Sequence, residues 1–276
     1  MLIRLAHSPD PDDAFMFYGL ASGAVDPGPY QIQPVLADIQ TLNEQATRGT
    51  YEVTALSIHA YPFVADKYVL TSCGGSVGDG YGPLLVSREP LTVEQLAGRT
   101  IAVPGLRTTA YLVLRLLLDR TPFTPQVTPF DQIPQEVARG RVDAGLLIHE
   151  GQLTYPVQGL QKIVDLGVWW QERTGLPLPL GGNAVRRDLG GQTCRELTAL
   201  VRESICYGLE HRPAAVQYAL EFGRGLDTRL ADRFVGMYVN AWTLDYGPRG
   251  RAAIERLLRD GAAAGLVPSA GAIDFV

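Results

Sequence analysis

Lysine and cysteine are scarce in this chain of 276 residues, and each shortage narrows the chemistry. Lys67 and Lys162 are its lysines, and arginine, which does not deprotonate, supplies the other positive charge, so imine chemistry is disfavoured. Cys73, Cys194 and Cys206 form no CxxC motif, and an odd count supports neither a disulfide framework nor a structural zinc site. This cysteine usage is typical of a reducing compartment, and we expect a cytoplasmic protein.

Positive charge and long apolar segments are also limited. The chain has 24 basic and 29 acidic side chains, whereas a nucleic-acid surface needs concentrated lysine and arginine. No segment approaches the roughly 18 consecutive apolar residues of a membrane span, and the opening MLIRLAHSPDPDD lacks the apolar run of a secretory signal. We therefore expect neither nucleic acid nor a membrane among the partners of this protein.

Motifs for cofactors, metals and nucleotide phosphates are missing. No GxGxxG motif opens a helix, no GK[ST] ends a glycine loop, and both HExxH and an acidic calcium loop are absent. The letters GGSVG at 74–78 match a nucleophile elbow, but that motif needs an immediate helix, and here more glycines and a strand follow. The sequence predicts no cofactor, no metal site and no hydrolase built on Ser76.

Strand and helix patterns alternate through the first half of the chain. Residues 2–7 alternate apolar and polar side chains like a strand, and prolines and acids then open a helical segment. Residues 100–105 form another apolar strand, followed at 105–120 by apolar residues with helical spacing. With 46% hydrophobic residues and a length near two domains of roughly 150 residues, this order predicts an α/β protein.

An internal similarity indicates two related lobes. RGTYEVTALSIH at 48–59 and RGRVDAGLLIH at 139–149 share Arg-Gly, a short apolar strand and Ile-His. Each copy ends at the carboxyl edge of its strand, where ligands bind in α/β sheets. Strands predicted near 80–89 and 179–188 could cross between the lobes. The predicted division is one lobe from residues 1–88 and 179–276, and a second lobe from residues 89–178.

Histidines end both copies of this repeat. His149 closes the second copy and is followed by Glu150, and His59 closes the first. An imidazole at the opening of a cleft could act as a general base, because histidine ordinarily titrates near pH 6.5. A lone histidine at a strand end is more often a surface or capping residue, so the pattern leaves both interpretations open.

Hydroxyl groups follow two of the predicted strands. Thr108 and Thr109 lie between a strand and a helix, where free amide groups and the helix dipole favour a carboxylate or a phosphate. A plain helix cap by one of these threonines fits the pattern equally well. Ser57, which follows the strand at 52–56, offers a matching hydroxyl from the other lobe.

The opening of the chain places two carboxylates side by side. Asp12 and Asp13 could form a paired-carboxylate site. They directly follow Pro11, which fits the first turn of a helix, and acidic side chains stabilise that turn. Capping of the first helix is therefore the simpler interpretation of this pair.

Several longer segments together resemble a known enzyme family. The likeness spans most of the chain and is densest from 1 to 185. It is carried by HSPDPDDAFMFYGL at 7–20, TALSIHAY at 54–61, the glycine loop before GPLLVS, VPGLRTTAY at 103–111, AGLLIHE at 144–150 and DLGVWWQERTGLPLPLG at 165–181. These segments are similar to the 1,4-dihydroxy-6-naphthoate synthases of the futalosine route to menaquinone. The resemblance implies a two-lobed, periplasmic-binding-protein-like fold of type II, with two crossover strands and a ligand cleft between the lobes.

The resemblance also implies a reaction and the residues that perform it. Cyclic dehypoxanthinyl futalosine would lose dihydroxyacetone in a carbon–carbon lyase step that leaves 1,4-dihydroxy-6-naphthoate, with His149 as the general base. No cofactor would be needed, and hydrogen-bond donors would stabilise the enolate. The positions that match the family's substrate-binding segments are Ala55, Leu56, Ser57, Thr108, Thr109 and Ala110.

The chain departs from the family's pattern at two places. Family members often carry lysine before Leu-Ser, where this chain has Ala55, so no side-chain charge is expected there. The opening often reads SPCPND, and here Asp10 and Asp12 stand in place of the cysteine and the asparagine. Neither difference changes the implied base.

Three other functions share parts of this pattern. Chorismate dehydratase of the same pathway is also two-lobed and binds a carboxylate, and a non-catalytic carboxylate-binding protein would have the same architecture. The effector domain of a regulator would need a helix-turn-helix segment, which this net-acidic chain does not show. The LIHE histidine and the paired threonines favour the synthase. In each case a small-molecule carboxylate is the expected partner, and a homodimer stays open.

Overall fold

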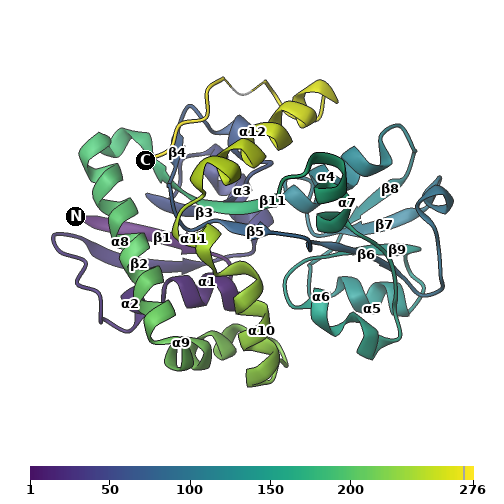
Figure 1. The fold of residues 1–276 in the computed structure, drawn as a ribbon, viewed down its shortest axis with the longest axis horizontal. Coiled ribbons are helices and arrows are strands. Elements are labelled where there is room, and N and C mark those ends of the chain that lie inside the picture. Colours follow the sequence, from purple (N-terminus) through teal and green to yellow (C-terminus); the bar gives the residue numbers. More distant parts are fainter. Residues whose placement is uncertain (270) are drawn as a thin grey trace.

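The computed structural model describes residues 1–269 and 271–276 and contains two β-sheets that lie side by side (Figure 1). The first sheet has the strand order β2 (Gln31–Leu36), β1 (Leu2–His7), β3 (Val53–Ser57), β11 (Leu178–Arg186) and β4 (Tyr68–Leu70), and β5 (Ser76–Gly78) also pairs with β11. The second has the order β10 (Gln161–Asp165), β6 (Leu84–Ser87), β9 (Ala144–Leu147), β7 (Thr100–Val103) and β8 (Thr124–Val127). We call the parts of the chain around these sheets the first lobe and the second lobe.

Helices alternate with the strands, as the sequence predicts for an α/β protein. Those before β6 are α1 (Pro11–Met16), α2 (Tyr18–Ala21) and α3 (Ile39–Thr47). Those between β7 and β11 are α4 (Thr109–Leu118), α5 (Ile133–Ala138), α6 (Gly151–Thr154) and α7 (Leu166–Thr174). Those after β11 are α8 (Gly191–Glu210), α9 (Arg212–Ala219), α10 (Thr228–Tyr238), α11 (Ala241–Leu244) and α12 (Gly247–Ala263). Within the described ranges, no helix combines the length and the apolar character needed to cross a membrane.

The two sheets repeat one arrangement of strands. In the first lobe, β1 pairs in parallel with β2 and β3, and β3 pairs antiparallel with β11. In the second lobe, β7 pairs in parallel with β8 and β9, and β9 pairs antiparallel with β6. The internal similarity seen in the sequence therefore falls on equivalent strands, β3 and β9. Each of these strands is followed closely by a histidine.

The chain changes lobe twice. Leu84–Ser87 already pairs within the second sheet, so the first change of sheet precedes the predicted boundary at residue 88 by several residues. The return follows Asp165, where β10 ends, and α7 then leads to β11 in the first sheet. The strands β5, β6 and β11 run through the region between the lobes (Figure 1). The predicted two-lobed fold with crossover strands is confirmed.

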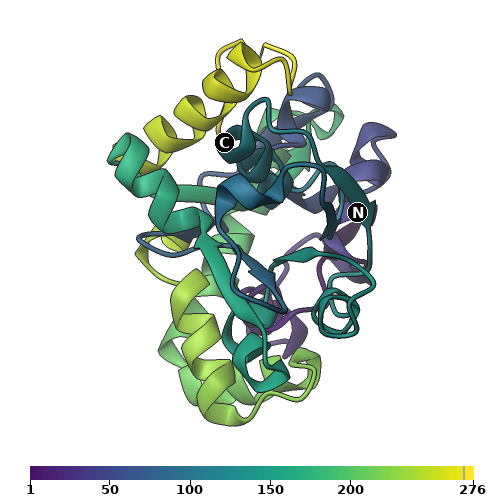
Figure 2. The same cartoon turned by 90° about the vertical axis from the view of Figure 1, so that its right-hand side faces the viewer.

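Buried residues of both lobes pack into one hydrophobic cluster. Leu56 of β3 and Leu257 of α12 share this cluster with Leu85 of β6, Ile101 of β7 and Leu112 of α4. All five side chains are fully buried. From the side of the second lobe, α12 and the pair α9 and α10 lie at opposite ends of the molecule (Figure 2). Burial of this much apolar surface joins the lobes, so they are not independent folding units.

Candidate active site

A cavity of about 680 Å³, counting the space at its mouth, opens between the two lobes. Many of the residues around it lie at or just after the carboxyl ends of β1, β3 and β9 or begin α1 and α4, which is where α/β folds place their ligands, and others come from β11 and α10. No lysine or arginine lines it among the described residues. The side chains with titratable groups that line it are Asp10, Asp12, Asp13, His149 and Tyr238.

His149 reaches this cavity from the turn between β9 and α6. Its backbone φ is +52°, in the left-handed region that few residues other than glycine, asparagine, aspartate and histidine adopt. The carbonyl oxygen of His149 accepts the amide of Gln152, which closes the turn. The ring packs edge-on against Phe130, with centroids 4.7 Å apart. A strained conformation held by such a turn is typical of a functional residue.

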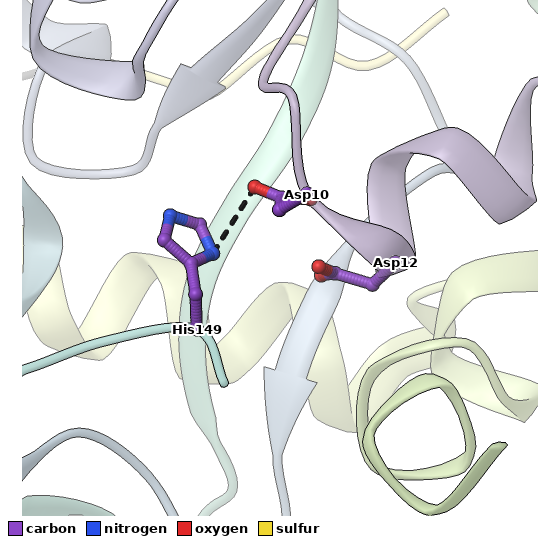
Figure 3. Close-up of side chains that lie close together, drawn as sticks. All are labelled: Asp10, Asp12 and His149. Carbon is purple, nitrogen blue, oxygen red and sulfur yellow. Dashed lines mark ion pairs between the residues drawn. The ribbon is translucent and has the colours of Figure 1, made fainter. Parts of the chain in front are cut away.

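The two ring nitrogens of His149 have different surroundings. Nδ1 lies 3.1 Å from Oδ2 of Asp10, which begins α1 in the opposite lobe (Figure 3). Nε2 is buried and has no hydrogen-bond partner among the residues that the structure describes. A carboxylate at Nδ1 places the ring proton there and leaves the lone pair on Nε2. This tautomer presents a base to whatever occupies the cavity.

Three carboxyl groups are buried together at the start of α1. Asp10 is the N-cap and accepts the amide of Asp13, while the side chain of Asp13 accepts the amide of Ser8. Asp12 accepts the hydroxyl of Ser76 on one oxygen, and its other oxygen has no partner among the described residues. The expectation that Asp12 and Asp13 cap this helix is therefore wrong, since Asp10 makes the cap. Pro11 at the first helical position pre-sets the turn, and all three acids face the cavity.

These carboxyl groups do not ionise alike. Burial and repulsion from Asp10 and Asp13 raise the pKa of Asp12 well above its usual value, and burial and Asp10 do the same for Asp13. Burial also opposes ionisation of Asp10, but attraction to His149 and a hydrogen bond with Asp12 outweigh it and lower the pKa of Asp10. Of the three carboxyl groups, Asp10, which contacts the imidazole, is therefore the one that ionises most readily.

Hydrogen-bond donors, rather than carboxyl groups, lie after β3 and β7. Ser57 at the end of β3 is held by Asn43 of α3, whose side-chain nitrogen donates to the serine hydroxyl at 2.9 Å and whose oxygen accepts the serine amide at 2.9 Å. Thr109 and Ala110 form the first turn of α4 and line the cavity. Helix N-terminal amides and a serine hydroxyl suit a carboxylate.

The cavity brings together most of the residues predicted from the sequence. Six of them line it: Ala55, Leu56, Ser57, Thr109, Ala110 and His149. Thr108 does not reach the cavity wall, because its hydroxyl caps α4 by accepting the amide of Tyr111 and donating to the carbonyl of Gly105. The carbonyl of Thr108 contacts Nδ1 of His59, which also lies outside this cavity.

The sequence analysis did not identify three residues that make contacts at the cavity. Asn43 holds Ser57, Asp10 contacts His149, and Gln152 accepts the hydroxyl of Tyr238 across the cleft at 2.7 Å. Asn43 lies beside the buried Leu42 and shares its helix face with Ala46, so a polar residue on the apolar side of a predicted helix was the available signal. For Asp10 the signal was the departure from the SPCPND pattern.

A divalent cation could also be held here. Asp10, Asp12 and His149 each present a ligand atom, and these atoms lie within 4.8 Å of one another. Two carboxylates and an imidazole are a common ligand set for transition metals. A cation at Nδ1 of His149 would replace the direct contact with Asp10, so the two arrangements exclude each other.

Comparison with known proteins gives matches along nearly the whole chain. A family model described as menaquinone biosynthesis matches residues 3–263. A 1,4-dihydroxy-6-naphthoate synthase of Thermus thermophilus is 46% identical over 264 residues, covering 96% of this chain and 95% of that protein. The enzyme of the same name from Streptomyces coelicolor is 42% identical over 273 residues, covering 98% and 96%.

Solved structures resemble the fold as well. A protein of Archaeoglobus fulgidus has a TM-score of 0.92 at 48% identity, covering 96% of this chain and 98% of its own. The alkanesulfonate-binding protein of Xanthomonas axonopodis pv. citri has a TM-score of 0.71 at 14% identity, covering 97% and 94%. That second likeness concerns the fold alone, and it agrees with the predicted periplasmic-binding-protein-like architecture.

Proposed function

Because the chain belongs to the menaquinone biosynthesis family, we propose that it is a 1,4-dihydroxy-6-naphthoate synthase in which His149 is the general base. The reaction releases dihydroxyacetone from cyclic dehypoxanthinyl futalosine by cleavage of a carbon–carbon bond. The observation that carries the assignment of the base is the buried Nε2 of His149 at the wall of the cavity, which has no partner in the part of the chain that the structure describes, with a carboxylate at Nδ1.

The proposed step begins with a proton transfer to His149. Nε2 takes the proton of a hydroxyl on the sugar-derived ring, the oxygen becomes a carbonyl, and the adjacent carbon–carbon bond breaks. The electron pair of that bond passes to the future naphthoate ring as an enolate, and aromatisation drives the step forward. General-base help of this kind contributes about 10²–10⁴-fold to the rate.

The charges around the cavity favour one orientation of the ligand. A carboxylate placed beside Asp10 would meet a negative charge in a buried site, which is costly. Ser57 and the first turn of α4 offer donors and no acid, so they would anchor the carboxylate and help to stabilise the enolate. The hydroxyl-bearing ring then faces His149. This orientation needs no charged side chain at Ala55.

The proposal includes the compartment and the ligand. Cys73, Cys194 and Cys206 are all unpaired, as expected for a cytoplasmic enzyme in a reducing environment. The expected ligand is a small aromatic carboxylate without a resident cofactor. The residues of this chain supply the base and the donors that the proposed reaction needs.

The experiment is turnover of cyclic dehypoxanthinyl futalosine by the purified protein, followed by naphthoate absorbance, with chorismate as the alternative substrate. Formation of naphthoate supports the proposal. Consumption of chorismate would instead assign the dehydratase reaction. Binding of 1,4-dihydroxy-6-naphthoate without turnover of either substrate would leave a non-catalytic carboxylate-binding protein.

A further inference from the structure

The base of the proposed reaction and its partner come from opposite lobes. His149 lies in the turn after β9 of the second sheet, whereas Asp10 lies in the turn between β1 and α1 of the first. Their side chains meet at 3.1 Å across the cavity (Figure 3). The side chain of Asp10 is 1% exposed and that of His149 is 15% exposed. Both groups of this pair are therefore largely removed from solvent.

Asp10 is fixed independently of His149. Its Oδ1 accepts the amide of Asp13 at 3.1 Å, which caps α1, and this leaves Oδ2 to face the imidazole. The two oxygens thus have separate and defined partners. A carboxylate held in this way presents an acceptor to His149 in a fixed direction.

Nothing else in the described structure selects the tautomer of His149. Nε2 has no partner, and Phe130 contacts the ring edge-on without accepting a ring proton. Without Asp10, the proton could lie on either nitrogen, and only one of these tautomers is a base toward the cavity.

Two further contacts tie the same turn to the first lobe. Arg224 lies 3.5 Å from Glu150 and places its guanidinium 4.6 Å from the centre of the Phe130 ring. Tyr238 donates its hydroxyl to Gln152. The turn that carries His149 is therefore held from the opposite lobe at three positions, His149, Glu150 and Gln152. Separation of the lobes would break all three contacts together.

On these grounds we propose that Asp10 is a positioning residue, which holds His149 across the cleft in the tautomer with Nε2 free. The inference deepens the proposed function, because it assigns the group that keeps the base in its active form. Asp10 is also the position at which the opening of this chain departs from the pattern that often reads SPCPND.

Two variants separate positioning from a structural role. In Asp10→Asn, the amide of Asp13 requires the side-chain carbonyl as acceptor, so the NH₂ group faces Nδ1 of His149 and donates to it. The ring proton then moves to Nε2. In Asp10→Ser, the hydroxyl keeps the cap of α1 but does not reach the imidazole. A structural role predicts that the isosteric asparagine is the milder change, whereas positioning predicts the opposite.

The first measurement is turnover with KM and kcat separated. We expect Asp10→Asn to lower kcat by about 10²–10⁴-fold, at most the loss caused by removal of His149 itself, because the wrong tautomer takes away the base, with KM within about threefold. Asp10→Ser should lower kcat by about 10–100-fold, because part of the population keeps the active tautomer. Asp227→Asn is the matched control, because Asp227 caps α10 through its side chain and does not line the cavity, and its loss should stay below about tenfold. A milder effect of Asp10→Asn than of Asp10→Ser would overturn the proposal.

The second measurement does not depend on turnover. Imidazole ¹⁵N shifts of the histidines, recorded with bound 1,4-dihydroxy-6-naphthoate and assigned with His149→Asn, report which nitrogen carries the proton. The expected pattern is a proton on Nδ1 in the wild type, on Nε2 in Asp10→Asn, and on both in Asp10→Ser. The same pattern in all three proteins would overturn the proposal, even if the substrate were different from the proposed one.

The metal alternative is tested with the same samples. Loss of wild-type turnover after treatment with a chelator, restored by Mn²⁺ or Zn²⁺, would make Asp10, Asp12 and His149 ligands of a cation and would overturn the direct contact. Turnover that is unchanged by the chelator supports the direct contact between Asp10 and His149.

Discussion

The two lobes have the same strand arrangement but carry opposite chemistry at equivalent turns. The turn after β1 leads into α1 with the acids Asp10, Asp12 and Asp13, whereas the turn after β7 leads into α4 with the hydroxyls of Thr108 and Thr109. Both helix starts are capped by a side chain, but the start of α1 is surrounded by carboxyl groups, whereas the start of α4 has hydroxyl groups and no acid. The fold supplies two similar positions, and a few side chains give them the different roles that the proposed function assigns to them.

The two histidines that end the copies of the repeat, His59 and His149, also differ in their surroundings. His59 is buried, bonds the carbonyl of Thr108 and lies beside Arg107, and burial lowers its pKa to about 4. His149 has a left-handed backbone and turns its ring into the cavity. The histidine of the first copy is thus buried against α4, and the histidine of the second copy is the one that lines the cavity.

Replacement of His149, the proposed base, is expected to have the largest effect on turnover. Asparagine tolerates the left-handed backbone of His149, so His149→Asn should fold normally and lower turnover by about 10²–10⁴-fold. Its affinity for 1,4-dihydroxy-6-naphthoate should stay within about threefold of the wild type. Turnover assays, calorimetric titration and thermal melting check these three expectations.

The matched control is His59→Asn, which should retain turnover because His59 lies outside the cavity. Equal losses in the two variants would remove the difference between the two copies of the repeat.

The pH dependence of stability is expected to depend on His59, whose replacement should leave turnover unaffected. Because the pKa of His59 is near 4 when folded and its ordinary value is 6.5, the unfolded chain binds the proton more readily. The neutral histidine therefore contributes stability that is fully present above pH 6.5 and is lost as the pH falls toward 4, by about 3 kcal/mol at most. Urea unfolding at pH 7 and pH 4.5 should show a smaller pH dependence for His59→Asn than for the wild type. An unchanged pH dependence would contradict the burial argument.

Removal of a donor at the binding turn should have a moderate effect. Ser57→Ala deletes the hydroxyl beside the first turn of α4, and we expect about tenfold weaker binding of 1,4-dihydroxy-6-naphthoate, equivalent to about 1.4 kcal/mol. Benzoate and its uncharged amide serve as probes, since only the carboxylate should lose affinity. An equal loss for both probes would place the carboxylate elsewhere.

The smallest expected effect distinguishes the paired threonines. Thr108 caps α4, so Thr108→Ala should cost about 1 kcal/mol of stability and leave ligand affinity nearly unchanged. A thermal melt and the same titration measure the two quantities. A clear loss of ligand affinity without a loss of stability would contradict this and would indicate that Thr108 binds the ligand.

The sequence predicts the fold well because its signals are local and repeated. Short apolar strands, proline at the first turn of helices and the copied Arg-Gly to Ile-His segment are all read from neighbouring residues. The position of His149 at the end of β9 follows from the same periodicity. These features need no knowledge of how the lobes meet.

The contacts across the cleft could not be predicted in this way. Asp10 and His149 are 139 residues apart in the sequence. A capping aspartate also has the same sequence pattern whether or not its second carboxylate oxygen has a partner. Asn43 reaches Ser57 only because α3 packs beside β3. Such pairs depend on the three-dimensional closure of the chain rather than on spacing along it.

The apolar cluster that Leu56, Ile101 and Leu257 share between the lobes has a thermodynamic consequence. The halves cannot be separated into fragments without exposing that surface, so heat should melt the protein in one cooperative transition rather than two.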